Sequence, residues 1–307
     1  MLAFLLVSFL TLVELNCENL FDCSHDSLKQ DIEFTPDGSR HWTRTRFWEK
    51  LNHIGQDILS CSKELPDIVA LCEIENDSVA HYLTRRSLLR NAGYEYLMTE
   101  SPDVRGIDVA LLYQPSRFRP LCYDVIDVEP ISGMRPTRQI LHVEGITQAL
   151  DTIHLFIIHA PSRYGGEHTS RPFRMHVTQK LLEAIKRIDK GNVIVAGDFN
   201  DYAESPSLQL LERHGLVNVS KSAKGLYGKA HGTYRYKGEW HSIDHILLTS
   251  RMAERVDSVY INDSPFLLEE EKEYGGFRPR RSFSGFRYQR GGFSDHLPLV
   301  LRLKFKD

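Results

Sequence analysis

The feature that most constrains this chain is a set of short apolar runs, each of which ends abruptly in carboxylate, amide or imidazole side chains. Residues 193–196 read Val-Ile-Val-Ala and are followed at once by Gly-Asp-Phe-Asn at 197–200. Residues 68–72 end in the same way at Glu73. Because short β-rich runs are typical of buried strands, the polar groups that follow them are expected along one edge of a sheet. An α/β enzyme places a metal ion and its nucleophile at such an edge.

Composition limits the partners that this chain can have. Its 307 residues are 41% hydrophobic and 26% charged, which is enough to bury a large core without stapling. The net charge is −3, so the surface as a whole does not attract polyanions and any contact with phosphate must be local. None of the five cysteines forms a Cys-x-x-Cys pair, which argues against a zinc ribbon.

The first ten residues allow two interpretations. Residues 1–10 are almost wholly apolar, like the centre of a secretory signal, but they lack a basic start and an Ala-x-Ala-like cleavage site. They are too short to span a bilayer, and they run directly into a strand expected from Thr11. We expect a degraded export signal, which favours a secreted or periplasmic location over a cytoplasmic one, with an extension of the first strand as the alternative. Residues 11–307 contain no linker or repeat and are expected to form one domain.

The order of helical and strand patterns predicts a mixed α/β fold. Apolar residues at helical spacing predict helices at 46–60 and 79–91, and a third helix is expected from a cap at Ser170, with Pro172 in its first turn. Strand follows strand between residues 94 and 159, which argues against a purely alternating βαβ arrangement. The pattern favours two packed sheets flanked by helices.

Four of the polar residues suit the cleavage of a phosphodiester. A hard cation binds phosphate oxygens and prefers carboxylate ligands, which Glu73 and Asp295 offer. Asp198 can orient or deprotonate a water molecule. Asn200 lies two residues further on, and its amide can donate to the phosphate.

Two histidines supply hydrogen-bond donors that can carry charge near neutral pH. His159 ends an apolar run, and His296 follows the carboxylate of the last polar motif. Asp244 can hold an imidazole in position, as a carboxylate does in a catalytic dyad. The adjacent His245 would face the opposite side of the same strand, so we interpret it as structural.

Six motifs carry a resemblance to the endonuclease/exonuclease/phosphatase superfamily, the deoxyribonuclease I-like fold. They are Asn-Cys-Glu-Asn-Leu-Phe-Asp at 16–22, Leu-Cys-Glu at 71–73, Ile-His-Ala-Pro-Ser at 158–162, Gly-Asp-Phe-Asn at 197–200, Ile-Asp-His at 243–245 and Ser-Asp-His at 294–296. Each motif alone is weak, but all six occur in the family's order and span nearly the whole chain. Ser-Arg-Tyr-Gly-Gly at 162–166 and Gly-Gly-Phe at 291–293 resemble a bacterial branch of candidate nucleases. The resemblance implies an α/β fold, a four-layer α/β/β/α sandwich of two packed mixed sheets.

The resemblance also implies roles for single residues. Asn16 would support a metal site whose chief ligand is Glu73, and Asp295 would assist the metal or the dyad. Asp198 would position the attacking water, and Asn200 would contact the scissile phosphate. The metal would be Mg²⁺, or Mn²⁺ in its place.

The implied roles of the histidines are less specific. His159 would lie near the leaving group or the phosphate. Asp244 would pair with His296, which would act either as a base or as a charged donor to the phosphate.

The stretch 262–292 is expected to be one long irregular region that begins acidic and then turns basic. A charge run is usually only solvated. Here, however, aromatic residues alternate with the arginines and the run ends beside the last polar motif, which favours contact with a ligand. We therefore expect Arg280, Arg281 and Arg287 to bind the substrate, together with Arg163.

These patterns predict a metal-dependent phosphodiester hydrolase, in first place a nuclease that cleaves nucleic acid by in-line attack of water without a covalent intermediate. The alternative within the fold is a phosphatase or phosphodiesterase for inositol phosphates or sphingomyelin, because specificity lies in loops. A non-catalytic binding module is less favoured, since all the main groups are present. A calcineurin-like phosphoesterase would need Asp-x-His and Gly-Asn-His clusters, and the sequence has neither.

Overall fold

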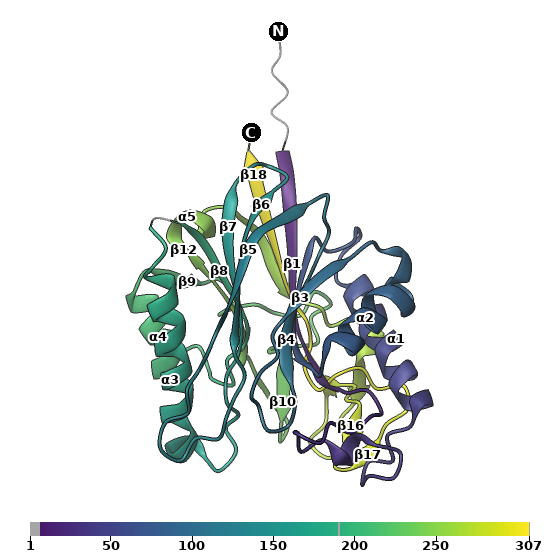
Figure 1. Cartoon of the computed structure of the whole chain (residues 1–307). Helices are drawn as coiled ribbons and strands as arrows, with labels where there is room; N and C mark the ends of the chain where they lie inside the picture. Colours follow the sequence, from purple (N-terminus) through teal and green to yellow (C-terminus); the bar gives the residue numbers. More distant parts are fainter. Residues whose placement is uncertain (1–6, 190, 307) are drawn as a thin grey trace.

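The computed structural model describes residues 7–189 and 191–306. Two six-stranded sheets lie face to face at its centre (Figure 1). The first sheet consists, in spatial order, of β13 (Val256–Ile261), β18 (Leu299–Lys306), β1 (Val7–Leu20), β2 (Ile68–Ile74), β4 (Asp108–Tyr113) and β3 (Glu95–Met98). The second consists of β5 (Phe118–Ile126), β6 (Ile140–Thr147), β7 (Thr152–His159), β8 (Asn192–Asp198), β12 (Asp244–Thr249) and β9 (Leu216–Asn218). Both sheets are mixed, because β1–β2 and β7–β8 are parallel pairs among antiparallel neighbours.

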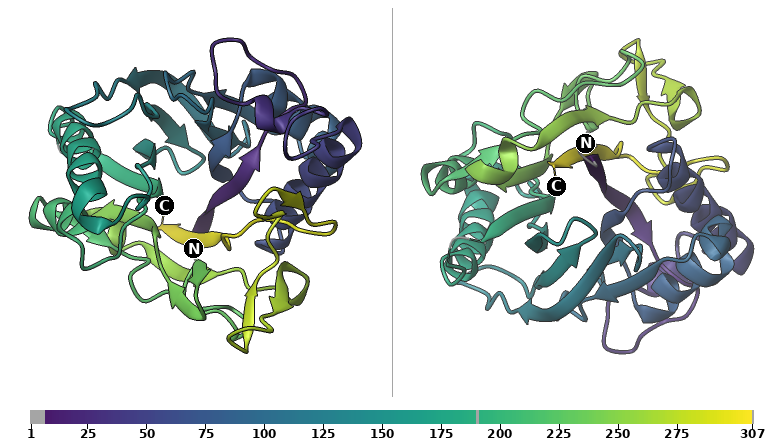
Figure 2. Two further views of the ribbon diagram at one scale, coloured as in Figure 1. Left: turned by 90° about the horizontal axis from the view of Figure 1, so that it is seen from below. Right: turned by 90° about the horizontal axis from the view of Figure 1, so that it is seen from above.

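Helices cover the outer face of each sheet. α1 (Arg44–Ser60) and α2 (Asp77–Arg86) pack on the first sheet. α3 (Glu167–Ile185) and α4 (Pro206–Arg213) pack on the second. Figure 2 shows the two layers of strands end-on, with the helices outside them. The expected four-layer α/β/β/α sandwich is therefore confirmed.

Alternation along the strands divides the apolar residues between the layers. In β1, Leu12 packs in the core between the two sheets, whereas Val13 and Leu15 pack on the helical side. Since side chains alternate along a strand, Glu14 and Asn16 share the inner face with Leu12. The inner face of β1 thus changes from aliphatic to polar toward its carboxyl end.

Short elements complete the chain. They are η1 (Ile32–Phe34), η2 (Leu88–Asn91), α5 (Ser250–Ala253), η3 (Pro265–Leu267) and the hairpins β10–β11 (Tyr234–Tyr236, Glu239–His241), β14–β15 (Leu268–Glu270, Phe277–Pro279) and β16–β17 (Phe283–Ser284, Arg287–Tyr288). The expectation of one irregular region at 262–292 is wrong, because the stretch contains two hairpins. Gly276 and Gly285 have φ of 77° and 60°, which their lack of a Cβ permits at these turns.

Two helices begin or end at other residues than expected. α3 begins at Glu167, and Ser170 lies inside it, where its hydroxyl donates to the carbonyl of Gly166 instead of capping the helix. The earlier start gives Glu167 a place in the first turn, where a carboxylate is favourable. The helix expected at 79–91 is divided into α2 and η2, because the backbone of Ser87 is extended. The hydroxyl of Ser87 accepts from the N–H of Leu89 and so caps η2, which begins at Leu88.

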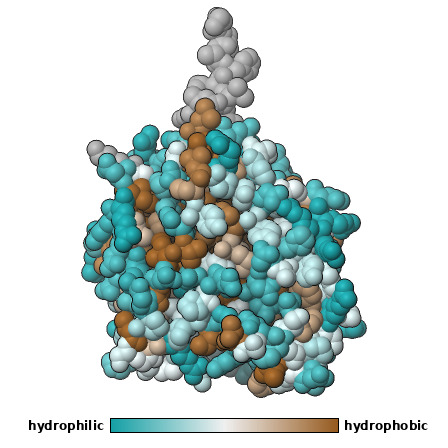
Figure 3. Space-filling model, viewed as in Figure 1, coloured by the Kyte–Doolittle hydropathy of each residue, from teal (hydrophilic) through white to brown (hydrophobic). Residues whose placement is uncertain are grey.

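The apolar N-terminal stretch is partly placed. Residues 7–10 form the start of β1 and pair with β18, while residues 1–6 lie outside the described residues. Within the described part of the chain, no helix is both long and apolar enough to cross a bilayer. Figure 3 shows a mostly hydrophilic face with small, scattered apolar patches.

Candidate functional site

The polar residues meet at one end of the sandwich, the lower end in Figure 1, where β1, β2, β7 and β8 finish. Parallel pairing of β7 and β8 places His159 beside Asp198. β12 runs antiparallel to β8, so its first residue, Asp244, lies beside Asp198 on the other side. Strand register alone therefore aligns His159, Asp198 and Asp244 in one row across the second sheet.

The first sheet presents Glu73 to this row through an irregularity. The β1–β2 ladder shifts between the pairs Asn16–Cys72 and Leu20–Ile74, and the β2–β4 ladder shifts around the same residue of β2. Glu73 has a φ of 61°, which costs a residue other than glycine on the order of 1–3 kcal/mol. Bulges of this kind re-aim a side chain, and they are frequent beside active sites.

Left-handed backbone conformations gather around the site. Glu18, Asn19 and Asn200 have φ of 50°, 61° and 49°. The N–H of Asn19 donates to Oε2 of Glu73 over 2.8 Å. This hydrogen bond holds the carboxylate by one oxygen and does not involve Oε1. The site is thus strained in several places at once, as functional sites often are.

Amide groups fix the carboxylate of Asp198. Nδ2 of Asn16 donates to its Oδ2 over 3.1 Å, and the backbone N–H of Asn200 donates to Oδ1 over 2.7 Å. Nδ2 of Asn200 donates to Oδ2 and to the carbonyl of Ala160, so here Asn200 orients Asp198. Burial raises the pKa of Asp198 to about 7, and the nearby Asp244 adds to the increase.

His296 and Asp244 form a buried dyad. Nδ1 of His296 lies 2.8 Å from Oδ2 and 3.0 Å from Oδ1 of Asp244, which also accepts from the hydroxyl of Thr233. The ring centre of Tyr234 lies 5.1 Å from the ring centre of His296. Burial by itself would lower the pKa of His296, but Asp244 outweighs it and the pKa lies well above 6.5. His296 is therefore charged at neutral pH.

His159, in contrast to His296, favours the neutral form. Its Nε2 lies 3.8 Å from Oε1 of Glu73 and 3.6 Å from Oδ2 of Asp198. Burial lowers the pKa of His159 well below 6.5, and the charges of Arg138 and Arg105 lower it further. The site therefore combines one neutral and one protonated imidazole.

Two groups of side chains could hold a cation. Ligand atoms of Asp198, Asp244 and His296 lie within 4.8 Å of one another, but these three groups are already hydrogen-bonded and His296 is positive. Oε1 of Glu73 and the carboxylate of Asp295 accept no hydrogen bond from any described residue.

The electrostatics of Asp295 point the same way. Burial raises its pKa, His296 opposes the increase and Glu73 adds to it. A hard cation between the free oxygens of Glu73 and Asp295 would relieve this repulsion, so the two residues fit Mg²⁺ or Mn²⁺. Asn16 donates to Asp198, and its Oδ1 accepts from the N–H of Glu18, so it supports the site by orienting Asp198.

The four arginines expected to bind substrate do not lie together. The charge of Arg281 lowers the pKa of Asp295, so this arginine lies near the site. Arg163 pairs with Asp201 at 2.8 Å, and Arg280 donates to the carbonyl of Leu268. Arg287 is exposed on the β16–β17 hairpin.

Several residues of the site escaped the sequence analysis. Glu14 is fully buried, and its side chain has no hydrogen-bond partner among the described residues, yet its inward position follows from strand alternation. Lys50 is buried in the apolar stripe of α1, where a charge is itself an unusual signal. Arg105 and Arg138 come from loops, and no sequence period marks them.

The chain is similar to known proteins of one family. A model of the endonuclease/exonuclease/phosphatase family matches residues 11–305. No curated protein matches the chain. A solved structure of a protein of that family from Bacteroides thetaiotaomicron has a TM-score of 0.64 at 15% identity and covers 98% of this chain and 99% of its own.

Two further solved structures have similar folds. D. rerio TDP2, complexed with single strand DNA product, has a TM-score of 0.59 at 17% identity, over 97% of this chain and 99% of that chain. A mannosyl-6-phosphatase from Bacteroides thetaiotaomicron has a TM-score of 0.59 at 15% identity, over 95% and 98%. At such identities the likeness concerns the fold.

Proposed function

This chain belongs to the endonuclease/exonuclease/phosphatase family of phosphoric ester hydrolases, and on that premise we propose that it is a metal-dependent nuclease. The observation that carries the proposal is the row of His159, Asp198 and Asp244, with His296 bonded to its end and the free oxygens of Glu73 and Asp295 beside it. Such a site can bind a phosphodiester, activate water and stabilise the charge that develops on phosphorus oxygens.

Each side chain has a definite part in this proposal. Glu73 and Asp295 would hold Mg²⁺ or Mn²⁺, which when bound supplies Lewis-acid stabilisation of the phosphate oxygens. Asp198, whose pKa is about 7, accepts the proton of the attacking water. The protonated His296 donates its Nε2 hydrogen to a non-bridging phosphate oxygen, while Asp244 holds the imidazolium in place.

The bond changes follow an in-line displacement. The water oxygen forms a new bond to phosphorus as the bond to the leaving oxygen breaks; the proton of the water passes to Asp198, and the leaving alkoxide takes its proton from solvent. Among the described residues, no serine, cysteine or lysine lies in the row itself, so water is the nucleophile that the proposal requires. The neutral His159, 3.6 Å from Asp198, adds no positive charge that would compete with the metal.

Nucleic acid is favoured as the substrate by the basic and aromatic side of the site. The charge of Arg281 acts on Asp295, and the hairpin that follows it exposes Phe286 and Arg287. Arginine and aromatic side chains together suit a strand that offers both phosphates and bases. A monophosphate or a sugar phosphate would not need an exposed ring.

A substrate panel tests the proposal. Plasmid DNA, single-stranded oligonucleotides, RNA, inositol phosphates and sphingomyelin vesicles are each incubated with Mg²⁺, with Mn²⁺ and with a chelator. We expect metal-dependent cleavage of nucleic acid, with one solvent ¹⁸O atom in the product phosphate. Hydrolysis of inositol phosphates or sphingomyelin alone would contradict the nuclease assignment, and full activity in chelator would contradict the metal requirement.

A further inference from the structure

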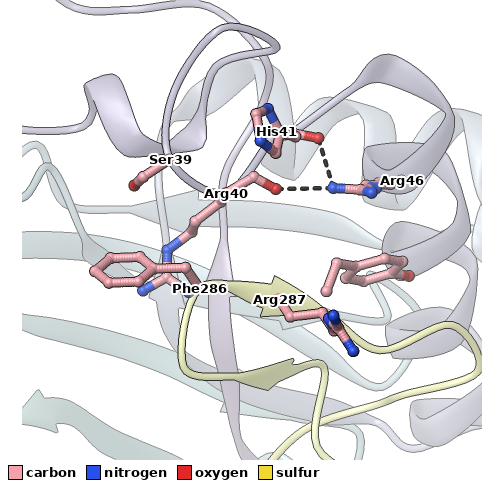
Figure 4. A pocket seen from close by; sticks show the side chains of 7 residues that line it. Ser39, Arg40, His41, Arg46, Phe286 and Arg287 are labelled. Atoms are coloured by element: carbon pink, nitrogen blue, oxygen red, sulfur yellow. Dashed lines mark hydrogen bonds between the residues drawn. The ribbon is translucent and has the colours of Figure 1, made fainter.

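An open hollow of about 280 Å³ lies beside the β16–β17 hairpin. Its lining residues come from the loop before α1, the first turn of α1 and the hairpin (Figure 4). They are Ser39, Arg40, His41, Arg46, Phe286, Arg287 and Tyr288. The hollow is therefore rich in guanidinium and aromatic groups, and none of these residues belongs to the row of catalytic side chains.

Two of its arginines carry uncompensated charge. One guanidinium nitrogen of Arg46 donates to the carbonyls of Arg40 and His41 over 2.8 and 2.7 Å, as the dashed lines in Figure 4 show. These carbonyls orient Arg46 without neutralising it, and its other donors stay available. Within the described ranges, no carboxylate forms an ion pair with Arg46 or Arg287, whereas Arg40 pairs with Glu33 at 3.0 Å.

The end of α1 adds to this positive field. Arg46 lies in the first turn of α1, and the N-cap residue Thr43 makes no side-chain capping hydrogen bond. The partial positive charge of a helix N-terminus favours anions, and arginines that are already oriented lose less entropy when they bind one. The hollow therefore suits a phosphate group.

Phe286 provides a flat apolar surface at the edge of the same hollow. Its side chain is 61% exposed, and the guanidinium of Arg40 lies 5.5 Å from its ring centre. Arg40 also lies 4.8 Å from the rings of Phe34 and Phe283, so the support beneath Phe286 is itself packed. A ring supported on one side and open elsewhere can stack on a nucleobase.

The hairpin is fastened to the catalytic end of the sandwich. The N–H groups of Ser282 and Phe283 donate to the carboxylate of Glu18, which follows Asn16 in β1. The hydroxyl of Ser282 and Nζ of Lys50 donate to the carbonyl of Phe293, two residues before Asp295. Four steps along the chain separate Ser282 from Phe286, so at the rise of a strand the two residues lie at most about 14 Å apart. The hollow is thus within reach of a strand of a few nucleotides held at the site.

We propose that this hollow is a subsite for single-stranded nucleic acid, in which Arg46 and Arg287 bind a phosphate and Phe286 stacks on a base. The inference rests on the proposed nuclease function and names the part of the substrate that lies away from the scissile phosphate. A single strand is required, because the bases of a duplex are stacked on one another and do not offer their faces. A lipid surface is disfavoured, because one exposed ring buries little apolar area in a membrane.

Binding without turnover tests the subsite. The anisotropy of a labelled single-stranded oligonucleotide is measured in chelator for the wild type, Arg46→Gln, Arg287→Gln and Phe286→Ala. The matched control is Arg213→Gln on α4, whose guanidinium contacts only Gln209 among the described residues. We expect each hollow variant to bind about tenfold more weakly and the control to bind like the wild type. The double arginine variant should lower the slope of log affinity against log salt by about 0.7, because the two arginines bind one phosphate.

Turnover of substrates of different length separates this inference from the proposed function. The small diester bis(p-nitrophenyl) phosphate cannot reach the hollow, so its metal-dependent hydrolysis should be equal in all variants, whereas KM for the longer oligonucleotide should rise. Wild-type hydrolysis of both substrates with unchanged KM in Phe286→Ala and Arg287→Gln would overturn the subsite alone. Absence of diester hydrolysis by the wild type, with oligonucleotide binding still lost in the variants, would overturn only the nuclease function. Equal binding of duplex DNA, or dependence on these residues only for anionic vesicles, would also overturn the subsite.

Discussion

His296 donates from Nδ1 to Asp244, whose two carboxylate oxygens lie 2.8 and 3.0 Å away. An ionised carboxylate cannot donate, so this contact fixes the direction of the hydrogen bond and leaves Nε2 of His296, 3.9 Å from Oδ1 of Asp295, available for another partner. The neutral His159 lies on the other side of Asp198, with its Nε2 3.6 Å from Oδ2. A protonated imidazole, His296, and a neutral one, His159, thus lie near the carboxylate of Asp198. At neutral pH the first can donate a hydrogen bond and the second can accept one.

Substitution of Asp244 should change the pH profile in one direction. Asp244 holds the pKa of His296 well above 6.5, so the imidazolium persists above neutral pH. Asp244→Asn should lower that pKa, so that the alkaline fall of kcat/KM begins at lower pH and activity at pH 8 drops about 100-fold. Profiles of kcat/KM and an NMR titration of His296 measure this effect. Asp257→Asn, at a half-exposed pair with Arg302, serves as the control, and an unmoved alkaline limb would contradict the role of the dyad.

Asp198 should show a trade-off between activity and stability. Burial raises its pKa from 3.8 to about 7 in the folded protein, so its contribution to stability is complete below pH 3.8 and is lost as the pH rises through 7. Asp198→Asn should therefore raise the free energy of unfolding at pH 8, in chelator, by on the order of 1 kcal/mol. The same variant should lose at least about 100-fold in kcat. Urea unfolding and turnover are measured together, and a stable variant with wild-type turnover would refute the assignment as base.

Strand patterns were sufficient to predict the fold. Val193 to Ala196 alternate between the two faces of β8, and the polar residues follow where the inner face leaves the core. That regularity comes from the period of two along a strand, which is a local property. The family motifs lie at these strand ends, so their order predicted the sandwich and the members of the row, while the roles of those residues stay predictions.

The parts of the site that were not anticipated depend on contacts between distant segments. Lys50 reaches Phe293 across 243 positions, and Glu18 reaches the N–H groups of a hairpin more than 260 positions away. No local period encodes such pairs. The bulge at Glu73 arises where β2 pairs with β1 and β4, and Arg287 meets residues 39–46 only when the two ends of the chain pack together.

The metal requirement should depend on Glu73. Its Oε2 accepts from the N–H of Asn19, and Oε1, 4.0 Å from a guanidinium nitrogen of Arg105, accepts no hydrogen bond from a described residue and can meet a cation. Glu73→Gln should weaken Mg²⁺ binding at least about tenfold, because an amide oxygen carries no net charge. The increase in thermal stability on addition of Mg²⁺ measures this without any turnover. Glu64→Gln, exposed after α1, should respond to Mg²⁺ like the wild type, and an equal response of Glu73→Gln would show that the cation binds elsewhere.

Lys50 should support the site through the loop that it anchors. Its Nζ lies in a fully buried position, 2.6 Å from the hydroxyl of Ser282 and 3.1 Å from the carbonyl of Phe293. Burial lowers the pKa of Lys50 and raises the pKa of Glu18 to about 8, and the charge of each group opposes the shift of the other.

Removal of this lysine tests the dependence. At pH 9, above the pKa of Glu18, Lys50→Met leaves a buried carboxylate without its cation and should cost about 3 kcal/mol in the free energy of unfolding. Lys50→Met combined with Glu18→Gln should cost less than the two single changes added together, because the second change removes the stranded charge. Urea unfolding of the four proteins in the cycle measures this coupling, with the exposed Lys63→Met as the control. Additive losses would show that the two charges do not interact.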